Sequence, residues 1–184
     1  MKTISLHSIS TAKNIAFAAL FSALCCIATV LLVVPLPNGY FNTGDVFVLL
    51  AGWCLGPLYG SFAAAIGSGL ADILSGFTAY APATFIIKGF DALLAYWVWA
   101  AMKKLVKKEK FALLPRIVAV IASETCMVLG YFLFEWFLYG FGGATLSLLG
   151  NLSQGICCGI CAVILIGVLY PIKAVKILFP ILNK

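Results

Sequence analysis

Charged residues are scarce in this sequence. Only 10% of the 184 residues are charged, there is a single histidine, and no GxxxxGK[ST] phosphate-binding loop occurs. So little charge excludes an ordinary soluble domain, and without the phosphate loop we expect no ATP hydrolysis by this chain. No Gly/Ser-rich linker, charge block or low-complexity stretch interrupts the sequence, so we expect a single domain over residues 1–184.

Hydrophobic residues dominate what is there. They make up 64% of the chain, and the mean hydropathy of +1.12 indicates an integral membrane protein. Breaks at Pro, Gly and Asn divide the apolar sequence into six expected helices, at about 14–34, 44–55, 58–76, 81–102, 113–138 and 148–170. The predicted fold class is therefore an all-α membrane protein, a compact bundle of six transmembrane helices.

Two local features refine this prediction. The first apolar run is roughly 20 residues long and has no small-residue cleavage site, so we expect a retained helix rather than a signal peptide. The second segment is short and is followed by Gly56-Pro57, which predicts a tight turn between two helices.

Basic residues set the expected orientation. With both termini in the cytoplasm, every Lys and Arg except Lys88 falls on the cytoplasmic side, as the positive-inside rule requires. This topology also accounts for the net charge of +6, and no nucleic-acid motif accompanies the basic clusters, so nucleic acid is not expected as a partner. Lys88 is left as the one base that needs a separate explanation.

Polar side chains recur at a similar depth toward the outer ends of five of these segments, and the first of them, Asp45, is expected to open the second segment at the outer face. Lipid cannot satisfy them, so we expect them to face one another or a ligand in a polar chamber open to the outside. Neighbouring aromatic rings would supply flat apolar walls for a small ring-shaped solute. The candidate substrate-binding residues are Asn38, Tyr40, Asn42, Asp72, Tyr80, Lys88, Tyr131, Glu135, Asn151 and Gln154.

The loop before the second segment contains Asn-Gly and two prolines. It is expected either to fold over the chamber as a lid, using Tyr40, Phe41 and Asn42, or to serve only as a connection.

The buried charges allow more than one pairing. Asp72 on the adjacent helix is the first candidate partner for Lys88, because buried charges usually occur in pairs. Asp91 lies three residues after Lys88 on the same helical face and is the second candidate. If neither pairs with it, Lys88 binds substrate. Glu124 lies nearer the middle of the membrane, where a structural hydrogen-bonding role is favoured.

Seven cysteines raise the question of redox or metal chemistry. Most lie inside apolar segments, where cysteine behaves as a small hydrophobe, so we expect no cofactor, no metal site and no enzymatic activity. One alternative is an intramembrane thiol oxidoreductase, and another is a ligand-free structural membrane subunit. The first would use Cys25, Cys26, Cys157, Cys158 and Cys161.

Small residues at four-residue spacing form two stripes. On the first helix these are Ala12, Ala16, Ala19 and Ala23, and residues 60–71 carry a similar stripe. Such stripes let another helix approach closely. We expect one stripe to serve packing within the bundle and the other to serve a partner.

The central stretch resembles a known family. The residues GYFNTGDVFVLLAGWCLGPLYGSFAAAIGSGLADILSG, then YAPATFIIKG, and the alanine-rich first helix are similar to substrate-binding S components of energy-coupling factor (ECF) transporters, in the branch for riboflavin, hydroxymethylpyrimidine and pyridoxine. The resemblance implies a multi-pass protein of the bacterial cell membrane. It also implies that a vitamin binds under the loop between the first two helices, and that the protein works with a transmembrane coupling subunit and two ATPase subunits.

Two further expectations follow from this resemblance. The family's alanine surface for the coupling subunit would correspond to Ala19 and Ala23, or to Ala12 and Ala16. Acids outnumber bases near the expected chamber, which favours a neutral or weakly cationic solute such as pyridoxine or hydroxymethylpyrimidine, with riboflavin as the alternative.

Overall fold

A computed structural model describes residues 6–36, 38–106 and 113–183. The described residues form four long helices and a small β-hairpin. The elements in chain order are α1 (Leu6–Leu31), β1 (Val34–Pro35), β2 (Tyr40–Phe41), α2 (Asp45–Leu74), α3 (Ala81–Leu105), α4 (Leu114–Leu169), α5 (Lys173–Leu178) and the 3₁₀ helix η2 (Pro180–Asn183). β1 pairs antiparallel with β2. All four long helices are long and apolar enough to cross a membrane, so the all-α membrane class is confirmed.

The expected count of six separate helices is not what the structure has. The expected turn at Gly56-Pro57 lies inside α2, and the expected break between 138 and 148 lies inside α4. Each of these helices contains one residue with non-helical backbone angles, Gly56 or Gly140. We call 45–55 and 57–74 the first and second arms of α2, and 114–139 and 141–169 the first and second arms of α4.

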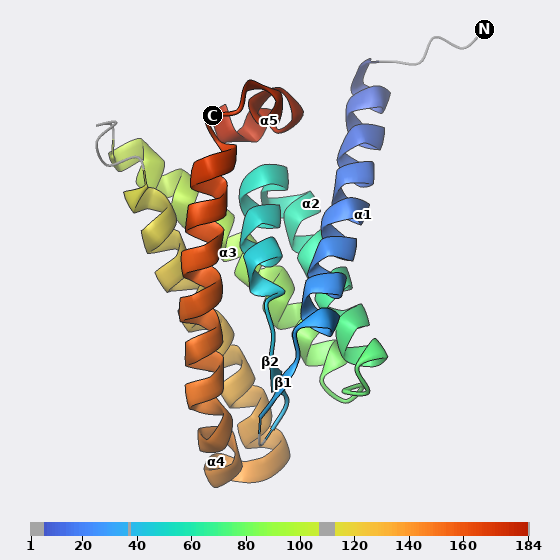
Figure 1. Cartoon of the computed structure of the whole chain (residues 1–184), viewed down its shortest axis with the longest axis vertical. Coiled ribbons are helices and arrows are strands. Elements are labelled where there is room, and N and C mark those ends of the chain that lie inside the picture. The colour runs from blue at the N-terminus through green and yellow to red at the C-terminus, as the bar shows by residue number, and fades with distance from the viewer. Residues whose placement is uncertain (1–5, 37, 107–112, 184) are drawn as a thin grey trace, which may run out of the picture.

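Both long helices double back at these glycines, as Figure 1 shows for α4 at the lower end of the molecule. Close contacts fix the antiparallel arrangement. In α2, Gly60 lies against the backbone of Ala51, and in α4, Gly155 and Gly159 lie against Glu124 and Val120. A single residue therefore reverses the chain direction in each case.

The glycine requirement at the two reversals is conformational. Gly56 has φ +80° and Gly140 has φ +75°, a region that residues with a Cβ rarely adopt. Pro57 follows Gly56 as the first residue of the second arm, where its missing N–H costs no helical hydrogen bond. The expected start of the last helix at residue 148 is too late, because the helix resumes directly after Gly140 and includes Gly142 and Gly143.

The core lies where the first arm of α2 packs between its neighbours. Gly52 contacts the backbone of Ala92 on α3, and an added Cβ would lie 2.4 Å from the Ala92 carbonyl oxygen. Next to it, the fully buried Trp53 donates from Nε1 to the Ala95 carbonyl at 3.2 Å. The first arm is thus held against α3 by both close packing and a hydrogen bond.

Different segments of the chain gather at the two ends of the bundle. Lys13 and Lys103 donate to the carbonyls of Ile177 and Leu182, at 3.5 and 3.1 Å, so the start of α1, the end of α3 and the C-terminal segment share one end. The β-hairpin and the Gly140 reversal lie at the opposite end (Figure 1). The expected assignment of the basic end to the cytoplasm stays a prediction.

Candidate functional site

A small polar cavity lies at the hairpin end of the bundle. Its volume is about 30 Å³. Nine of the ten residues expected to bind substrate line it, all except Lys88, and Gly39 and Thr84 complete the wall. The lining residues are Asn38, Gly39, Tyr40, Asn42, Asp72, Tyr80, Thr84, Tyr131, Glu135, Asn151 and Gln154. Residues far apart in sequence therefore meet in one place.

One wall of the cavity is a tyrosine–carboxylate pair between the hairpin and α2. Tyr40 on β2 donates from its hydroxyl to Asp72 Oδ1 at 2.5 Å, and its ring packs on Phe77 with centroids 4.7 Å apart. Burial raises the pKa of the Tyr40 phenol above its ordinary value, and the bond to Asp72 raises it further. The phenol therefore keeps its proton and acts as the donor.

A second tyrosine–carboxylate pair joins α3 to α4. Tyr80, just before α3, donates from its hydroxyl to Glu135 Oε1 at 3.3 Å, and its ring packs on Phe134 with centroids 5.2 Å apart. Burial is again the main cause that raises the pKa of the Tyr80 phenol. Both tyrosines thus present a hydroxyl to one oxygen of a buried carboxylate.

The other oxygen of each carboxylate has no such partner. Asp72 Oδ2 and Glu135 Oε2 accept no hydrogen bond from the described residues. The hydroxyls of Thr84 and Ser147 lie close to these carboxylates. Thr84 also shares a hydrogen bond with the Tyr131 hydroxyl at 3.0 Å, in which either hydroxyl can be the donor, and Ser147 donates to the Asn38 carbonyl at 3.2 Å. In this arrangement each carboxylate accepts a bond from a tyrosine at one oxygen and none at the other.

The hairpin is tied down over the cavity at its tip. Asn38 donates from Nδ2 to the Gly143 carbonyl at 2.7 Å and accepts at its own carbonyl from Ser147. Both partners belong to the second arm of α4. The hairpin thus covers the cavity and is fastened to α4, the position expected of a lid.

The floor of the cavity is an amide that bridges two elements. Gln154 on α4 accepts at Oε1 from the backbone N–H and the side-chain amide of Asn42, at 2.8 and 3.2 Å. Its Nε2 donates to Asp45 Oδ2 at 2.6 Å. The segment after the hairpin is therefore anchored deep in the bundle, and Asn42 is held further by Thr29 on α1.

Lys88 lies below this floor, and its partner differs from the one expected. It forms a buried salt bridge with Asp45, while Asp72 bonds to Tyr40 instead. From the sequence, Asp45 is expected at the outer face because a helix starts there. In the structure α2 starts inside the bundle, and Asp45 is fully buried. The expected Asp72–Lys88 pair is therefore wrong, and Lys88 does not line the cavity.

The charges around Lys88 extend further into the bundle. Asp91 and Glu124 interact electrostatically with the Lys88 ammonium, and its Nζ lies 5.3 Å from the centre of the Tyr131 ring. Asp91 thus contributes to the surroundings of Lys88, although the direct salt bridge is with Asp45.

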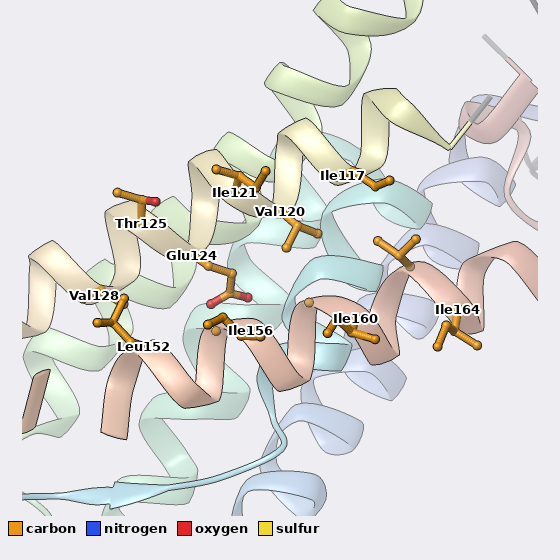
Figure 2. Close-up of a pocket in the computed structure, with 13 residues that line it drawn as sticks. Ile117, Val120, Ile121, Glu124, Thr125, Val128, Leu152, Ile156, Ile160 and Ile164 are labelled. Atoms are coloured by element: carbon orange, nitrogen blue, oxygen red, sulfur yellow. The ribbon is translucent and has the colours of Figure 1, made fainter. Parts of the chain in front are cut away.

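A larger hollow occurs between the two arms of α4, but its character is different. It is a groove of about 470 Å³ walled by isoleucine, valine and leucine side chains, with Glu124 and Thr125 among them (Figure 2). Glu124 is only 5% exposed and lies against Gly155 at the contact between the arms. An apolar groove on a membrane-spanning surface offers few polar groups to orient a solute.

The cysteines differ widely in how exposed they are. All seven are free thiols, and they range from the fully buried Cys25 to the exposed Cys157 and Cys161. Within residues 6–36, 38–106 and 113–183, no group of three or more His, Cys, Asp or Glu side chains is placed to hold a metal ion.

Two cavity residues were missed from the sequence. Thr84 lies one helical turn before Lys88. Because residues four apart share a face of a helix, Thr84 could have been predicted to face the same side as Lys88. Gly39 has φ +73°, so its role is to allow the turn of the hairpin. The burial of Asp45 and its salt bridge with Lys88 were also missed, because nothing in the sequence indicates that this helix starts inside the bundle.

These observations define a multi-pass membrane protein with a small polar cavity near one end. The sequence matches the model of the ECF-type riboflavin transporter S component family over residues 9–171. The chain belongs to this family, whose members are vitamin-binding subunits of membrane transporters rather than enzymes. The chain is also 33% identical over 132 residues to an uncharacterized protein of Pyrococcus woesei, an alignment that covers 71% of this chain and 83% of that protein.

Proposed function

We propose that this chain binds a small vitamin or vitamin precursor with high affinity at the hairpin end and imports it together with an ECF coupling subunit and two ATPase subunits. The observation that carries the proposal is the cavity under the hairpin, where nine residues selected for their polar or aromatic character meet. We place the chain in a bacterial cell membrane with its basic end, and both termini, in the cytoplasm.

The charge balance of the cavity favours a pyridoxine-like or hydroxymethylpyrimidine-like solute. Lys88 is neutralised by Asp45 beneath the floor, so the charged side chains on the wall are the acids Asp72 and Glu135. Such a wall suits a neutral or weakly cationic ring with hydroxyl groups better than an anion. Riboflavin is the second candidate, because the family that matches the chain is named for its transport.

The cavity must enlarge before it can hold such a solute. Its volume of about 30 Å³ is far below the roughly 300–1,000 Å³ of typical small-molecule sites. The hairpin is the element that we propose moves, because it covers the cavity and is held to α4 by contacts of Asn38 and Leu36. We propose that the hairpin opens to admit the solute.

The proposed surface for the coupling subunit is the outer face of α1. All four stripe alanines, Ala12, Ala16, Ala19 and Ala23, are exposed. The other small-residue stripe is buried within the bundle, where Gly60 meets the first arm of α2 and Gly67 meets the Ser22 carbonyl. The α1 stripe is therefore free for a partner helix, and the α2 stripe is used internally.

The primary experiment is to purify the protein in mild detergent and identify co-purified small molecules by native mass spectrometry. A vitamin panel is then added, and thermal stabilisation is measured. We expect at least one of pyridoxine, hydroxymethylpyrimidine and riboflavin to raise the unfolding temperature. A protein that retains no small molecule and is stabilised by none of the panel would contradict the proposal.

The coupling surface is tested separately with Ala19→Trp. This variant should lose uptake in cells that express the ECF module while it keeps ligand binding in detergent. A matched control is Leu20→Trp, because Leu20 is also exposed on α1 but lies outside the alanine stripe. Equal loss of binding and uptake in Ala19→Trp would instead indicate a role in folding of the bundle.

A further inference from the structure

The cavity contains two copies of one local arrangement. In each, a tyrosine hydroxyl occupies one oxygen of a carboxylate that is nine-tenths or more buried: Asp72 is 4% exposed and Glu135 is 2% exposed. In each, the second oxygen is buried and accepts no hydrogen bond from the described residues. A buried acceptor left in this state costs free energy that a donor from a ligand would recover.

The two copies stand on different elements. Asp72 lies near the end of the second arm of α2, and Glu135 lies on the first arm of α4. Both line the same cavity. A solute that enlarged the cavity would therefore meet an open carboxylate oxygen from each of two walls.

No free base among the lining residues is available to balance these oxygens. Lys88 is held by Asp45, and Gln154 uses its Nε2 on Asp45 and its Oε1 on Asn42. The phenol protons of Tyr40 and Tyr80 are directed to the carboxylates themselves. A phosphate or carboxylate on the solute would therefore face two acids without a cation to pair with.

We propose that Asp72 Oδ2 and Glu135 Oε2 are the two recognition points for the solute, and that each accepts a hydrogen bond from a donor on a neutral or singly cationic ring compound. The chemical class is a heteroaromatic ring with an amino, hydroxymethyl or protonated ring-nitrogen donor directed to each wall. Phosphorylated forms of the same ring are rejected. This inference rests on the proposed vitamin-binding function and specifies which atoms carry its selectivity.

The test uses the full-length protein in detergent and measures dissociation constants by isothermal titration calorimetry. The probes are pyridoxine, hydroxymethylpyrimidine and riboflavin, each beside its own phosphate ester. We expect the best unphosphorylated probe to bind at least about a hundredfold more tightly than its ester, because two unpaired like charges oppose the phosphate.

Two isosteric variants locate the effect. Asp72→Asn and Glu135→Gln keep the side-chain size but remove the charge and introduce an amide donor opposite the ligand donor. Each should weaken binding of the best probe by about ten- to a hundredfold, the usual range for a lost hydrogen bond to a charged group.

The matched controls are buried acids outside the cavity. Asp91→Asn changes a fully buried aspartate on α3, and Glu124→Gln changes a buried glutamate on the same arm of α4 as Glu135. Both controls should bind the probe as the parent does. Size-exclusion profiles and ligand-free unfolding temperatures establish that each variant is folded.

A second measurement needs no variant. Analogues of the best probe in which one donor is methylated should each lose affinity for the unaltered protein, since each removes one of the two hydrogen bonds.

The outcomes separate the two proposals. If no probe binds the parent, the vitamin-binding function fails and the inference fails with it. If a probe binds but its phosphate ester binds equally well, the inference is overturned while the function stands. The inference is likewise overturned if the Asp72 and Glu135 variants behave like their controls, or if methylation of the donors has no effect.

Discussion

The trio of Asp45, Lys88 and Gln154 beneath the cavity floor and the carboxylates of the cavity above it contain the same kinds of residue but differ in how many carboxylate oxygens accept a hydrogen bond. Asp45 in this trio uses both carboxylate oxygens, one for Lys88 and one for Gln154. Asp72 and Glu135 in the cavity each use one oxygen for a tyrosine and leave the other open. All three acids are buried.

This difference indicates two roles: fully bonded charges stabilise the bundle, and half-bonded carboxylates bind a solute. A fully satisfied charge in a membrane protein has no acceptor left for a ligand, and its partners are arranged to stabilise one structure. A half-satisfied carboxylate in a cavity is costly without a ligand and less costly with one. Asp45, Lys88 and Gln154 should therefore control stability, and the cavity carboxylates should control affinity.

The largest effect is expected from Lys88→Met. It leaves Asp45 as an unpaired buried carboxylate and should lower the free energy of unfolding by about 3–5 kcal/mol, measured by thermal unfolding in detergent. The double variant Asp45→Asn/Lys88→Met removes both charges and should recover much of this loss. If Lys88→Met unfolds at the parent temperature, the salt bridge does not stabilise the bundle.

Gln154→Leu should affect both regions, because Gln154 joins them. The change leaves the Asn42 N–H and one Asp45 oxygen without their partner, at a cost of about 1–3 kcal/mol in stability, and ligand affinity should fall as well. Asn151→Leu is the control, since Asn151 lines the cavity one helical turn earlier. Asn151→Leu should reduce affinity with a smaller loss of stability than Gln154→Leu. If Asn151→Leu instead destabilised the protein more, the floor and the wall of the cavity would not differ in this way.

Asn38→Ala should change ligand exchange more than stability. It removes the bond from the hairpin tip to the Gly143 carbonyl, worth about 1 kcal/mol, so the hairpin should open more readily and the ligand should dissociate faster in stopped-flow measurements. Asn183→Ala removes a comparable amide bond, to the Lys176 carbonyl at the opposite end of the molecule, and serves as the control. An unchanged dissociation rate in Asn38→Ala would mean that this bond does not gate the cavity.

The smallest effect is expected from removal of the thiols. Replacing the exposed Cys157 and Cys161 with serine and the other five cysteines with alanine should leave ligand binding unchanged, because none of them lines the cavity. The buried substitutions should lower the unfolding temperature slightly. Loss of uptake with normal binding and folding would revive the thiol oxidoreductase alternative.

The sequence predicts much of the cavity because polar side chains on apolar membrane helices must face other polar groups and not lipid. Asp72, Tyr80 and Glu135 meet as expected, since lipid excludes every alternative. Gly56-Pro57 is correctly predicted as the point where the chain turns. These successes depend on local rules that tertiary packing does not override.

The errors concern where helices start. The sequence predicts Asp45 at the membrane surface, which leaves Asp72 as the expected partner of Lys88. The burial of Asp45 depends on the course of the preceding segment, in which Asn42 is drawn inward by Gln154 from a distant part of the chain. The second error, the late start of the last helix, comes from glycines at 142 and 143 that the structure accommodates within α4. Neither outcome follows from local sequence.

Under the proposed import function, the inward start of α2 would also shorten the path of the solute across the membrane. The first arm, residues 45–55, is only about 16 Å long at about 1.5 Å per residue, roughly half of the ~30 Å hydrocarbon layer. A molecule resting on Asn42 and Gln154 would already have left the outer surface behind and would face a remaining barrier close to the length of this single arm. On the proposed function, translocation would require that one deep compartment be exposed to the other side, and it would not require a continuous pore.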